Sequence, residues 1–221
     1  MAISTVIFDF DGTLHDSMVI YRRALRRGYA WLVERGKAPA RELSDELIEC
    51  NIGLTAQEAW ERMCPDVPWS VSSEAAVLVG QTMDELIAAG EARLYPGVQE
   101  MLSTVATDHR LVFLSNCRNA YRDAVREAFG FDRWFTNYYT AEQFNGAPKE
   151  TIFETIREEV EGPYIAVGDR YKDLALARAH ALPSIGCLYG YGSKEELAGA
   201  THLAKTPAEI PSLLARIDLG R

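Results

Sequence analysis

Short apolar runs recur along the chain, and each ends at turn-forming or polar residues. The runs occupy 5–8, 110–114, 164–167 and 183–188. Runs of this length, bounded in this way, are typical of buried strands. Between the later runs, apolar residues recur three and four positions apart, which predicts amphipathic helices. These helical patterns cover 119–129, 149–160 and 172–181.

Strand and helix patterns therefore alternate over most of the chain. Such alternation predicts an α/β fold in which parallel strands are joined by crossover helices, as in Rossmann-like domains. In sheets of this kind, ligands bind beyond the carboxyl ends of the strands. We therefore expect functional residues at the positions where the apolar runs end.

The stretch 16–92 interrupts the alternation because it contains helical patterns and no convincing strand. The patterns cover 17–35, 41–51, 55–64 and 72–91. The third opens with Thr55 and has Glu58 three positions later, which is the spacing of a capping box. We expect 16–92 to form an all-helical cap domain that is inserted into a Rossmann-like core domain of 1–15 and 93–221.

Composition narrows the possible partners. The 221 residues are 48% apolar and 25% charged, as in ordinary globular proteins. The net charge of −9 provides no general basic surface, so neither nucleic acid nor an acidic membrane surface is an expected partner. No segment approaches the ~18 to 20 uninterrupted apolar residues that cross a bilayer, and the first residues do not resemble a secretory signal. The four cysteines lack metal-ligand spacing, which predicts reduced thiols and a cytoplasmic location.

The first apolar run ends in the sequence DFDGT, which places Asp9 and Asp11 two positions apart. A carboxylate pair before a glycine can simply cap a turn. A turn does not explain the other polar clusters, which also lie near strand ends. These clusters are Ser115 with Asn116, Lys149, and Asp169 with Asp173 in GDRYKD.

Together the clusters resemble the four ordered motifs of the haloacid dehalogenase superfamily. DFDGTLHDS is similar to the first motif, LSN to the second, Lys149 to the third and GDRYKD to the fourth, and the match covers nearly the whole chain. The closing LYGYGSKEELAGATH looks like that of phosphoglycolate-phosphatase-like members, which carry a helical cap after the first strand. The resemblance implies a Mg²⁺-dependent phosphatase that hydrolyses a small-molecule phosphate monoester through an aspartyl-phosphate intermediate.

The resemblance also implies roles for the carboxylates. Asp9 would attack phosphorus, and Asp11 would protonate the leaving oxygen and then activate water. With a reference pKa of about 3.9, Asp9 is expected to be ionised at pH 7 without the help of a base. Asp11 must carry a proton, so we expect nearby like charges to raise its pKa. Mg²⁺ would be held by Asp9, Asp169 and the backbone carbonyl of Asp11, with Asp173 acting behind these ligands.

The phosphoryl oxygens would be held by Ser115, Asn116 and Lys149, where negative charge gathers in the transition state. Taken alone, Ser115 fits a helix N-cap equally well, and Lys149 fits a solvated lysine in a first helical turn. Arg118, just beyond the second motif, is a further candidate for substrate binding. His15 follows the first motif, so the cap hinge or the neighbourhood of the substrate are candidate positions for it, and a histidine at the hinge or the surface is the more common case.

The cap contains a cluster of arginines at i,i+4 spacing on one predicted helix. It consists of Arg22, Arg23, Arg26 and Arg27. Such a face would suit an acidic substrate if it faced the site, but this spacing is more typical of a solvated helix face.

Two other functions fit the same motifs. A phosphomutase of the β-phosphoglucomutase kind shares them and differs in how its cap delays water. A non-catalytic binding module of this fold would be expected to have lost a ligand or the nucleophile, and no such residue is missing here. A haloacid dehalogenase is disfavoured because these enzymes lack an acid at the position of Asp11. A phosphonoacetaldehyde hydrolase needs a cap lysine, and Lys37 is the only lysine between 16 and 92.

Overall fold

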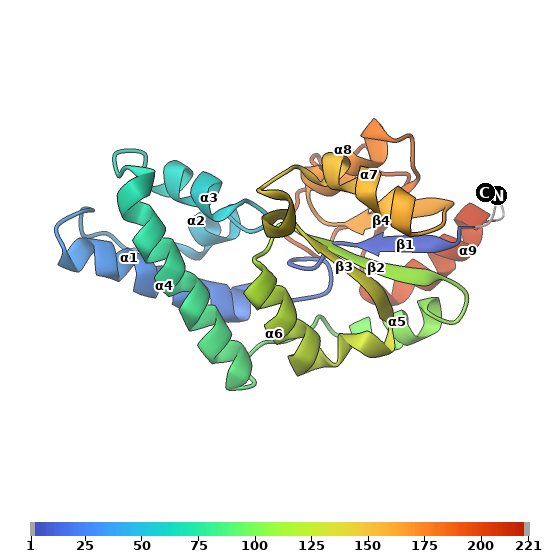
Figure 1. Cartoon of the computed structure of the whole chain (residues 1–221), viewed down its shortest axis with the longest axis horizontal. Helices are drawn as coiled ribbons and strands as arrows, with labels where there is room; N and C mark the ends of the chain where they lie inside the picture. The colour runs from blue at the N-terminus through green and yellow to red at the C-terminus, as the bar shows by residue number, and fades with distance from the viewer. Residues whose placement is uncertain (1–2, 219–221) are drawn as a thin grey trace.

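The structure is a computed structural model that describes residues 3–218. Six strands form one parallel sheet in the order β3-β2-β1-β4-β5-β6, which confirms the predicted α/β fold (Figure 1). They are β1 (Thr5–Phe8), β2 (Arg110–Ser115), β3 (Phe135–Thr140), β4 (Tyr164–Gly168), β5 (Ser184–Cys187) and β6 (His202–Ala204). Residues 1–2 and 219–221, which the expected core domain includes, lie outside the described residues.

Helices cover both faces of the sheet, so the central strands read as continuous apolar runs. One face packs against α5 (Val98–Val105), α6 (Asn119–Phe129) and α9 (Ile210–Asp218), and the other against α7 (Lys149–Glu159) and α8 (Tyr171–Ala179). In β1, Phe8 belongs to the first hydrophobic core and Ile7 to the second. The alternation of side chains along a strand thus supplies both cores from one buried run.

The sequence patterns did not predict β3, β6, α5 or α9. Both strands are edge strands of the sheet. β3 has the sequence FTNYYT and is only partly buried, and β6 has three residues. The two helices have eight and nine residues. Elements this short, or exposed on one side, carry too few apolar positions to establish a period.

Four helices lie between β1 and β2 in the sequence, and we call residues 18–88 the helical insert. They are α1 (Met18–Glu34), α2 (Asp45–Glu49), α3 (Ala56–Met63) and α4 (Trp69–Ala88). The predicted capping box at Thr55 is confirmed. The predicted bounds of α2 and α4 were less accurate: α2 spans 45–49 rather than 41–51, and α4 spans 69–88 rather than 72–91.

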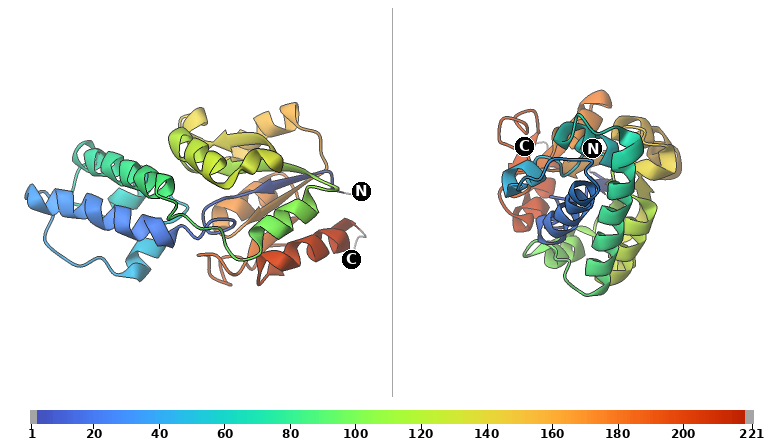
Figure 2. Two further views of the ribbon diagram at one scale, coloured as in Figure 1. Left: turned by 90° about the horizontal axis from the view of Figure 1, so that it is seen from below. Right: turned by 90° about the vertical axis from the view of Figure 1, so that its left-hand side faces the viewer.

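The helical insert has a hydrophobic cluster of its own, which includes Leu25, Leu32 and Trp60. α1 and α4 run side by side within it (Figures 1 and 2). Gly28 permits this close approach, since a Cβ atom there would lie 2.6 Å from a methyl group of Val79. Among residues 3–218, no helix is long and apolar enough to cross a membrane.

The helical insert lies at one end of the molecule, beyond the sheet (Figure 2). The two connecting segments run beside each other, because Asp16 donates its N–H to the carbonyl of Arg93 and Tyr95 donates to Leu14, both at 2.9 Å. The chain therefore enters and leaves the insert at one place, next to the carboxyl end of β1.

Candidate active site

The predicted site residues come from four elements that meet at one edge of the sheet. Asp9 follows β1, Ser115 ends β2, Asp169 follows β4 and Lys149 begins α7. The strands are parallel, so their carboxyl ends share this edge, as the sequence analysis expected.

Three buried carboxylates lie together there. Asp9, Asp169 and Asp173 offer ligand atoms within 4.8 Å of one another. Burial is the main reason that the pKa of Asp9 is raised, to about 7. Lys149 lowers this pKa, and the charges of Asp173 and Asp11 raise it further. Burial, followed by the charges of Asp9 and Asp173, also raises the pKa of Asp169. Burial therefore works against the ionised form of Asp9 that a nucleophile requires, and a cation beside Asp9 would favour that form.

This donor set fits a hard divalent cation. Oxygen ligands such as carboxylates are the ones that Mg²⁺ prefers, and three buried carboxylates meet here within 4.8 Å of one another. The only described side chain that donates to both Asp9 and Asp173 is Lys149, whose Nζ lies 2.5 Å from Asp9 Oδ1 and 2.6 Å from Asp173 Oδ1.

Lys149 is 4% exposed, which rules out the alternative of a solvated lysine. Burial alone would lower its pKa, but the charges of Asp173 and Asp9 outweigh burial and raise it, so Lys149 is a cation. Asp173 is equally enclosed. Its Oδ2 accepts the backbone N–H of Arg170 at 3.0 Å, so both of its oxygens have partners within the protein.

Asp169 is held by groups that sequence reasoning did not assign to the site. Its Oδ1 accepts from the Thr13 hydroxyl at 3.2 Å, and its Oδ2 accepts from the Tyr191 N–H at 2.8 Å. Gly12 has φ +88°, and a Cβ atom there would lie 2.2 Å from Asp169 Oδ2. The glycine of DFDGT therefore allows the carboxylate to approach. Gly190 and Gly192, on either side of Tyr191, are the sequence signal for a similar approach, since a Cβ atom at either position would lie 2.4 Å or less from an atom of Asp169.

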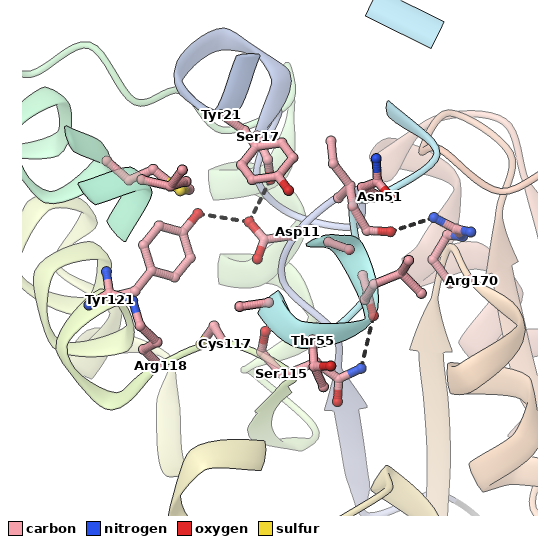
Figure 3. A pocket seen from close by; sticks show the side chains of 18 of the residues that line it. Asp11, Ser17, Tyr21, Asn51, Thr55, Ser115, Cys117, Arg118, Tyr121 and Arg170 are labelled. Atoms are coloured by element: carbon pink, nitrogen blue, oxygen red, sulfur yellow. Dashed lines mark hydrogen bonds between the residues drawn. The ribbon is translucent and has the colours of Figure 1, made fainter. Parts of the chain in front are cut away.

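Asp11 is the most heavily hydrogen-bonded carboxylate of the site. Ser17 and Tyr121 donate to the same oxygen, Oδ1, at 2.5 and 2.8 Å (Figure 3). His15 Nδ1 approaches that oxygen too, at 3.2 Å. Oδ2 has no partner among residues 3–218. Burial raises the pKa of Asp11, but the contacts with His15, Ser17 and Tyr121 outweigh burial and lower it. The expectation that neighbouring charges raise this pKa is therefore wrong for this arrangement.

His15 is fully buried, so a surface position is excluded. Its ring stacks on Phe10 with centroids 4.9 Å apart, and its Nδ1 faces both Asp11 and the Tyr121 hydroxyl. Its Nε2 has no hydrogen-bond partner within residues 3–218. His15 lies at the connection to the helical insert, which is the expected hinge position. It also contacts Asp11, a candidate catalytic carboxylate.

The side chains in and just after the second motif make contacts in two different places. Ser115 is 2% exposed and faces the same cavity as Asp9. It is not an N-cap, because α6 begins after Arg118. Asn116 donates through Nδ2 to the carbonyl of Gly53 in the helical insert at 3.0 Å. Arg118 pairs with Asp84 of α4 at 3.1 Å, so its guanidinium lies on the helical insert rather than on the carboxylates.

A cavity of about 150 Å³ lies between the sheet edge and the helical insert, and Asp11 lines it (Figure 3). Asp9 and Lys149 line it as well. Two further basic residues reach it from the fourth motif and its helix. Arg170 pairs with Glu196 at 2.9 Å and donates to the Ile52 carbonyl, and Lys172 pairs with Glu58 of α3 at 2.8 Å.

The arginine cluster of α1 does not line the cavity. Its four members pair with Asp45, Glu91 and Glu85 at the surface of the helical insert. The prediction of a solvated helix face is therefore confirmed. The four cysteines of the chain are unpaired.

Comparison with known proteins agrees with this geometry. The chain is 25% identical to a 5'-nucleotidase of Pseudomonas aeruginosa, over 95% of this chain and 94% of the relative. It is also 25% identical to a phosphoglycolate phosphatase of Synechococcus elongatus, over 94% of this chain and 95% of the relative. A crystal structure of a predicted phosphatase from Clostridium acetobutylicum superposes with a TM-score of 0.81 at 20% identity, covering 98% of this chain and all of that one, and shares the fold.

A model of the haloacid dehalogenase-like hydrolase family matches residues 3–180, which include all four motifs. The sheet order, the clustered carboxylates and this match agree, and the chain belongs to the haloacid dehalogenase-like hydrolases.

Proposed function

We propose that this hydrolase is a Mg²⁺-dependent phosphatase that acts on a phosphorylated small molecule through an aspartyl-phosphate intermediate. The observation that carries the proposal is that Asp9 and Asp11 line the same cavity. The first lies in a cluster suited to a cation, and the second presents a free carboxylate oxygen. Two carboxylates with such different surroundings suit two different tasks.

In the first half-reaction, a carboxylate oxygen of Asp9 bonds to phosphorus while the bond from phosphorus to the ester oxygen breaks. Asp11 gives its proton to that ester oxygen, which leaves as an alcohol. Ser17, Tyr121 and His15 all occupy Oδ1 of Asp11, so the transferred proton belongs on Oδ2. General acid help of this kind is typically worth 10² to about 10⁴ in rate.

In the second half-reaction, water attacks the phosphorus of the aspartyl-phosphate and Asp11 takes a proton from that water. The bond between phosphorus and Asp9 breaks, which releases inorganic phosphate and restores the carboxylate. Asp11 ends this step protonated. Its lowered pKa keeps the carboxyl group ionised, and so able to accept that proton, between substrates, and the arrival of an anionic phosphate beside it favours protonation for the first step.

Mg²⁺ fits the donor set described above, with Asp9, Asp169 and the Asp11 carbonyl as its proposed ligands. When bound, the ion neutralises negative charge on the carboxylates and on the phosphoryl group. Asp173 positions Lys149, which carries the fixed positive charge of the site. Ser115 and Asn116 are proposed to hold phosphoryl oxygens together with Lys149. Asn116 would have to leave the Gly53 carbonyl for this role, and Arg118 would have to leave Asp84 to bind substrate.

We also propose that 16–92 acts as the cap domain of the enzyme and that 1–15 with 93–221 forms its core domain. The separate hydrophobic cluster of the helical insert and its single point of connection support this division. Residues of both parts line the cavity, so closure of the cap would exclude water from it.

Release of phosphate from an aryl phosphate, measured with Mg²⁺ and with excess chelator, tests the proposed function. We expect turnover only with Mg²⁺, and a rapidly quenched reaction should yield protein carrying one acid-stable, hydroxylamine-labile phosphoryl group. Absence of turnover under all metal conditions would remove the phosphatase assignment. Metal-dependent turnover without a covalent phosphoryl group would remove Asp9 as the nucleophile.

A further inference from the structure

The cavity is chemically divided between its two walls. On the sheet side it is lined by carboxylates and basic residues. On the insert side every lining residue within the described chain is uncharged, and most are apolar. The larger ones are Leu25, Ile52, Leu54, Trp60, Val79 and Met83.

The basic residues of the cavity are all committed to acidic partners. Lys149 is held by Asp9 and Asp173, as described above. Arg118, Arg170 and Lys172 pair with Asp84, Glu196 and Glu58 at 3.1, 2.9 and 2.8 Å. Within residues 3–218, every basic side chain on the cavity therefore already has an acidic partner, which an additional anion on the substrate would have to displace.

The polar side chains of the insert wall reinforce this pattern. Asn51 lines the cavity, is 2% exposed and donates through Nδ2 to the Leu47 carbonyl at 2.7 Å. A carbonyl can only accept, so this contact fixes the orientation of the amide. Its Oδ1 is buried and has no partner among the described residues. Because its Nδ2 group is held by the Leu47 carbonyl and its Oδ1 can only accept, Asn51 offers no positive charge to an anion on the substrate.

We propose that the group released from phosphate is a neutral, largely apolar alcohol, and that the enzyme discriminates against substrates whose alcohol portion carries an anion. This inference rests on the proposed phosphatase function and names its substrate class. A single water needs about 10 to 15 Å³ of cavity measured in this way, so a cavity of about 150 Å³ has room for a substrate of roughly ten to fifteen non-hydrogen atoms, the phosphate group included. Phosphoglycolate falls outside the class, because its alcohol portion carries a carboxylate.

The physical reason for discrimination is desolvation. The phosphate group would bring its charge to the end of the cavity where Lys149 lies, and Mg²⁺ would add to the positive charge there. A second anion, on the alcohol portion, would lose water against the apolar wall and gain no ion pair. A neutral alcohol loses little on entry, and its apolar surface gains contact with Leu54, Trp60 and Val79.

The test compares two substrates that differ in one charge. The substrates 4-carboxybenzyl phosphate and 4-carbamoylbenzyl phosphate have nearly the same shape, and their substituent is remote from the P–O bond, so the chemical step is closely matched. We expect kcat/KM for the carboxylate to be at least tenfold lower at pH 7 with saturating Mg²⁺. A ratio below tenfold would overturn the proposal.

A variant tests whether the lack of charge on the insert side of the cavity causes this selectivity. Leu54 is half-buried on the cavity, and L54R places a cation there. The matched control is Q57R, which adds the same charge at an exposed position of α3 that does not line the cavity. L54R should improve the relative kcat/KM of the carboxylate at least tenfold, and Q57R by less than twofold. If the two variants behave alike, wall charge does not set the selectivity and the proposal is overturned.

The outcomes also separate this inference from the proposed function. If neither benzyl phosphate nor an aryl phosphate is hydrolysed under any metal condition, the phosphatase assignment fails, and the substrate class fails with it. If both benzyl phosphates are hydrolysed at similar kcat/KM, the phosphatase assignment stands and the substrate class alone is wrong.

Discussion

At the scale of single residues, Asp9 tests the nucleophile. We expect Asp9→Asn to lower kcat on an aryl phosphate by about 10³-fold or more, because the nucleophilic carboxylate is lost without a change in size. The fold should persist, so circular dichroism and the cooperativity of thermal unfolding should match the wild type. Asp108→Asn, at an exposed carboxylate, is the control. A kcat within tenfold of wild type would contradict the role of Asp9.

Asp11 tests the proton donor at the same scale. Alkyl phosphates release poor leaving groups and need a proton, whereas activated aryl phosphates do not. We therefore expect Asp11→Asn to lower kcat/KM for alkyl phosphates on the order of 10²-fold more than for aryl phosphates. The measurement is a series of phosphate monoesters with graded leaving-group pKa. A uniform loss across the series would show that Asp11 has another role.

The sequence was a good guide to which residues meet, and a poor guide to their protonation. The motif order placed Asp9, Lys149, Asp169 and Asp173 at one site because parallel strands end at one edge. The pKa of Asp11 could not be deduced, since it depends on how His15, Ser17 and Tyr121 pack around one carboxylate oxygen, and Tyr121 lies over a hundred residues away in the chain. Contacts of this kind follow from packing and leave no local sequence pattern.

At the scale of elements, an ion pair joins the helical insert to the sheet domain. Glu58 of α3 accepts from Lys172 of α8 at 2.8 Å and from the Thr55 N–H at 2.7 Å. Glu58→Gln keeps the capping box, because glutamine also accepts at this position, and removes the charge. We expect the free energy of unfolding to fall by up to about 1 kcal/mol at low salt, since the pair is partly exposed. The loss should vanish in about 1 M salt.

The control for this pair is Glu61→Gln, which removes a charge from the same helix without a partner on α8. The pH dependence has a definite sign. Burial raises the pKa of Glu58, but Lys172 and Thr55 outweigh it and lower the pKa. The stabilisation is therefore present above the unfolded pKa and lost as the pH falls through the folded value. Urea unfolding of the three proteins between pH 3 and 7, roughly spanning that range, would check this, and equal losses in both variants would count against the ion pair.

Element prediction succeeded where an element was long or buried on both faces. β1, β2 and α1 were predicted to within about one residue at each end. The edge strands β3 and β6 were missed because half of each lies near solvent, so apolar residues are fewer. α2 was overestimated because 41–44 continue a helical pattern, although Ser44 caps the helix and starts it at Asp45.

At the scale of the whole molecule, the carboxylate cluster should make stability depend on pH and on metal. Burial raises the pKa of Asp169 above its unfolded value, and burial raises that of Asp9 to about 7. A raised carboxyl pKa means that the folded state binds the proton more tightly. This contribution is complete below the unfolded pKa, about 4, and is lost as the pH rises through the folded pKa.

With chelator present, we therefore expect Asp169→Asn to gain stability relative to wild type as the pH rises from about 4 to about 7. Added Mg²⁺ should stabilise wild type and leave Asp169→Asn nearly unchanged, since binding to the folded state alone raises its stability. Urea unfolding with and without Mg²⁺ measures both effects. A parallel pH profile for the two proteins would contradict unfavourable charge at Asp169.

The contacts between the sheet domain and the helical insert also bear on how fast a product leaves the cavity. Asn116, Arg118, Arg170 and Lys172 each reach from the sheet domain to the helical insert around the cavity. Movement of the helical insert away from the sheet domain would have to break these contacts together. If release of the alcohol product requires that movement, the rate of the movement limits turnover on the fastest substrates. Because two of the contacts are partly exposed ion pairs, we then expect that rate to increase as ionic strength rises.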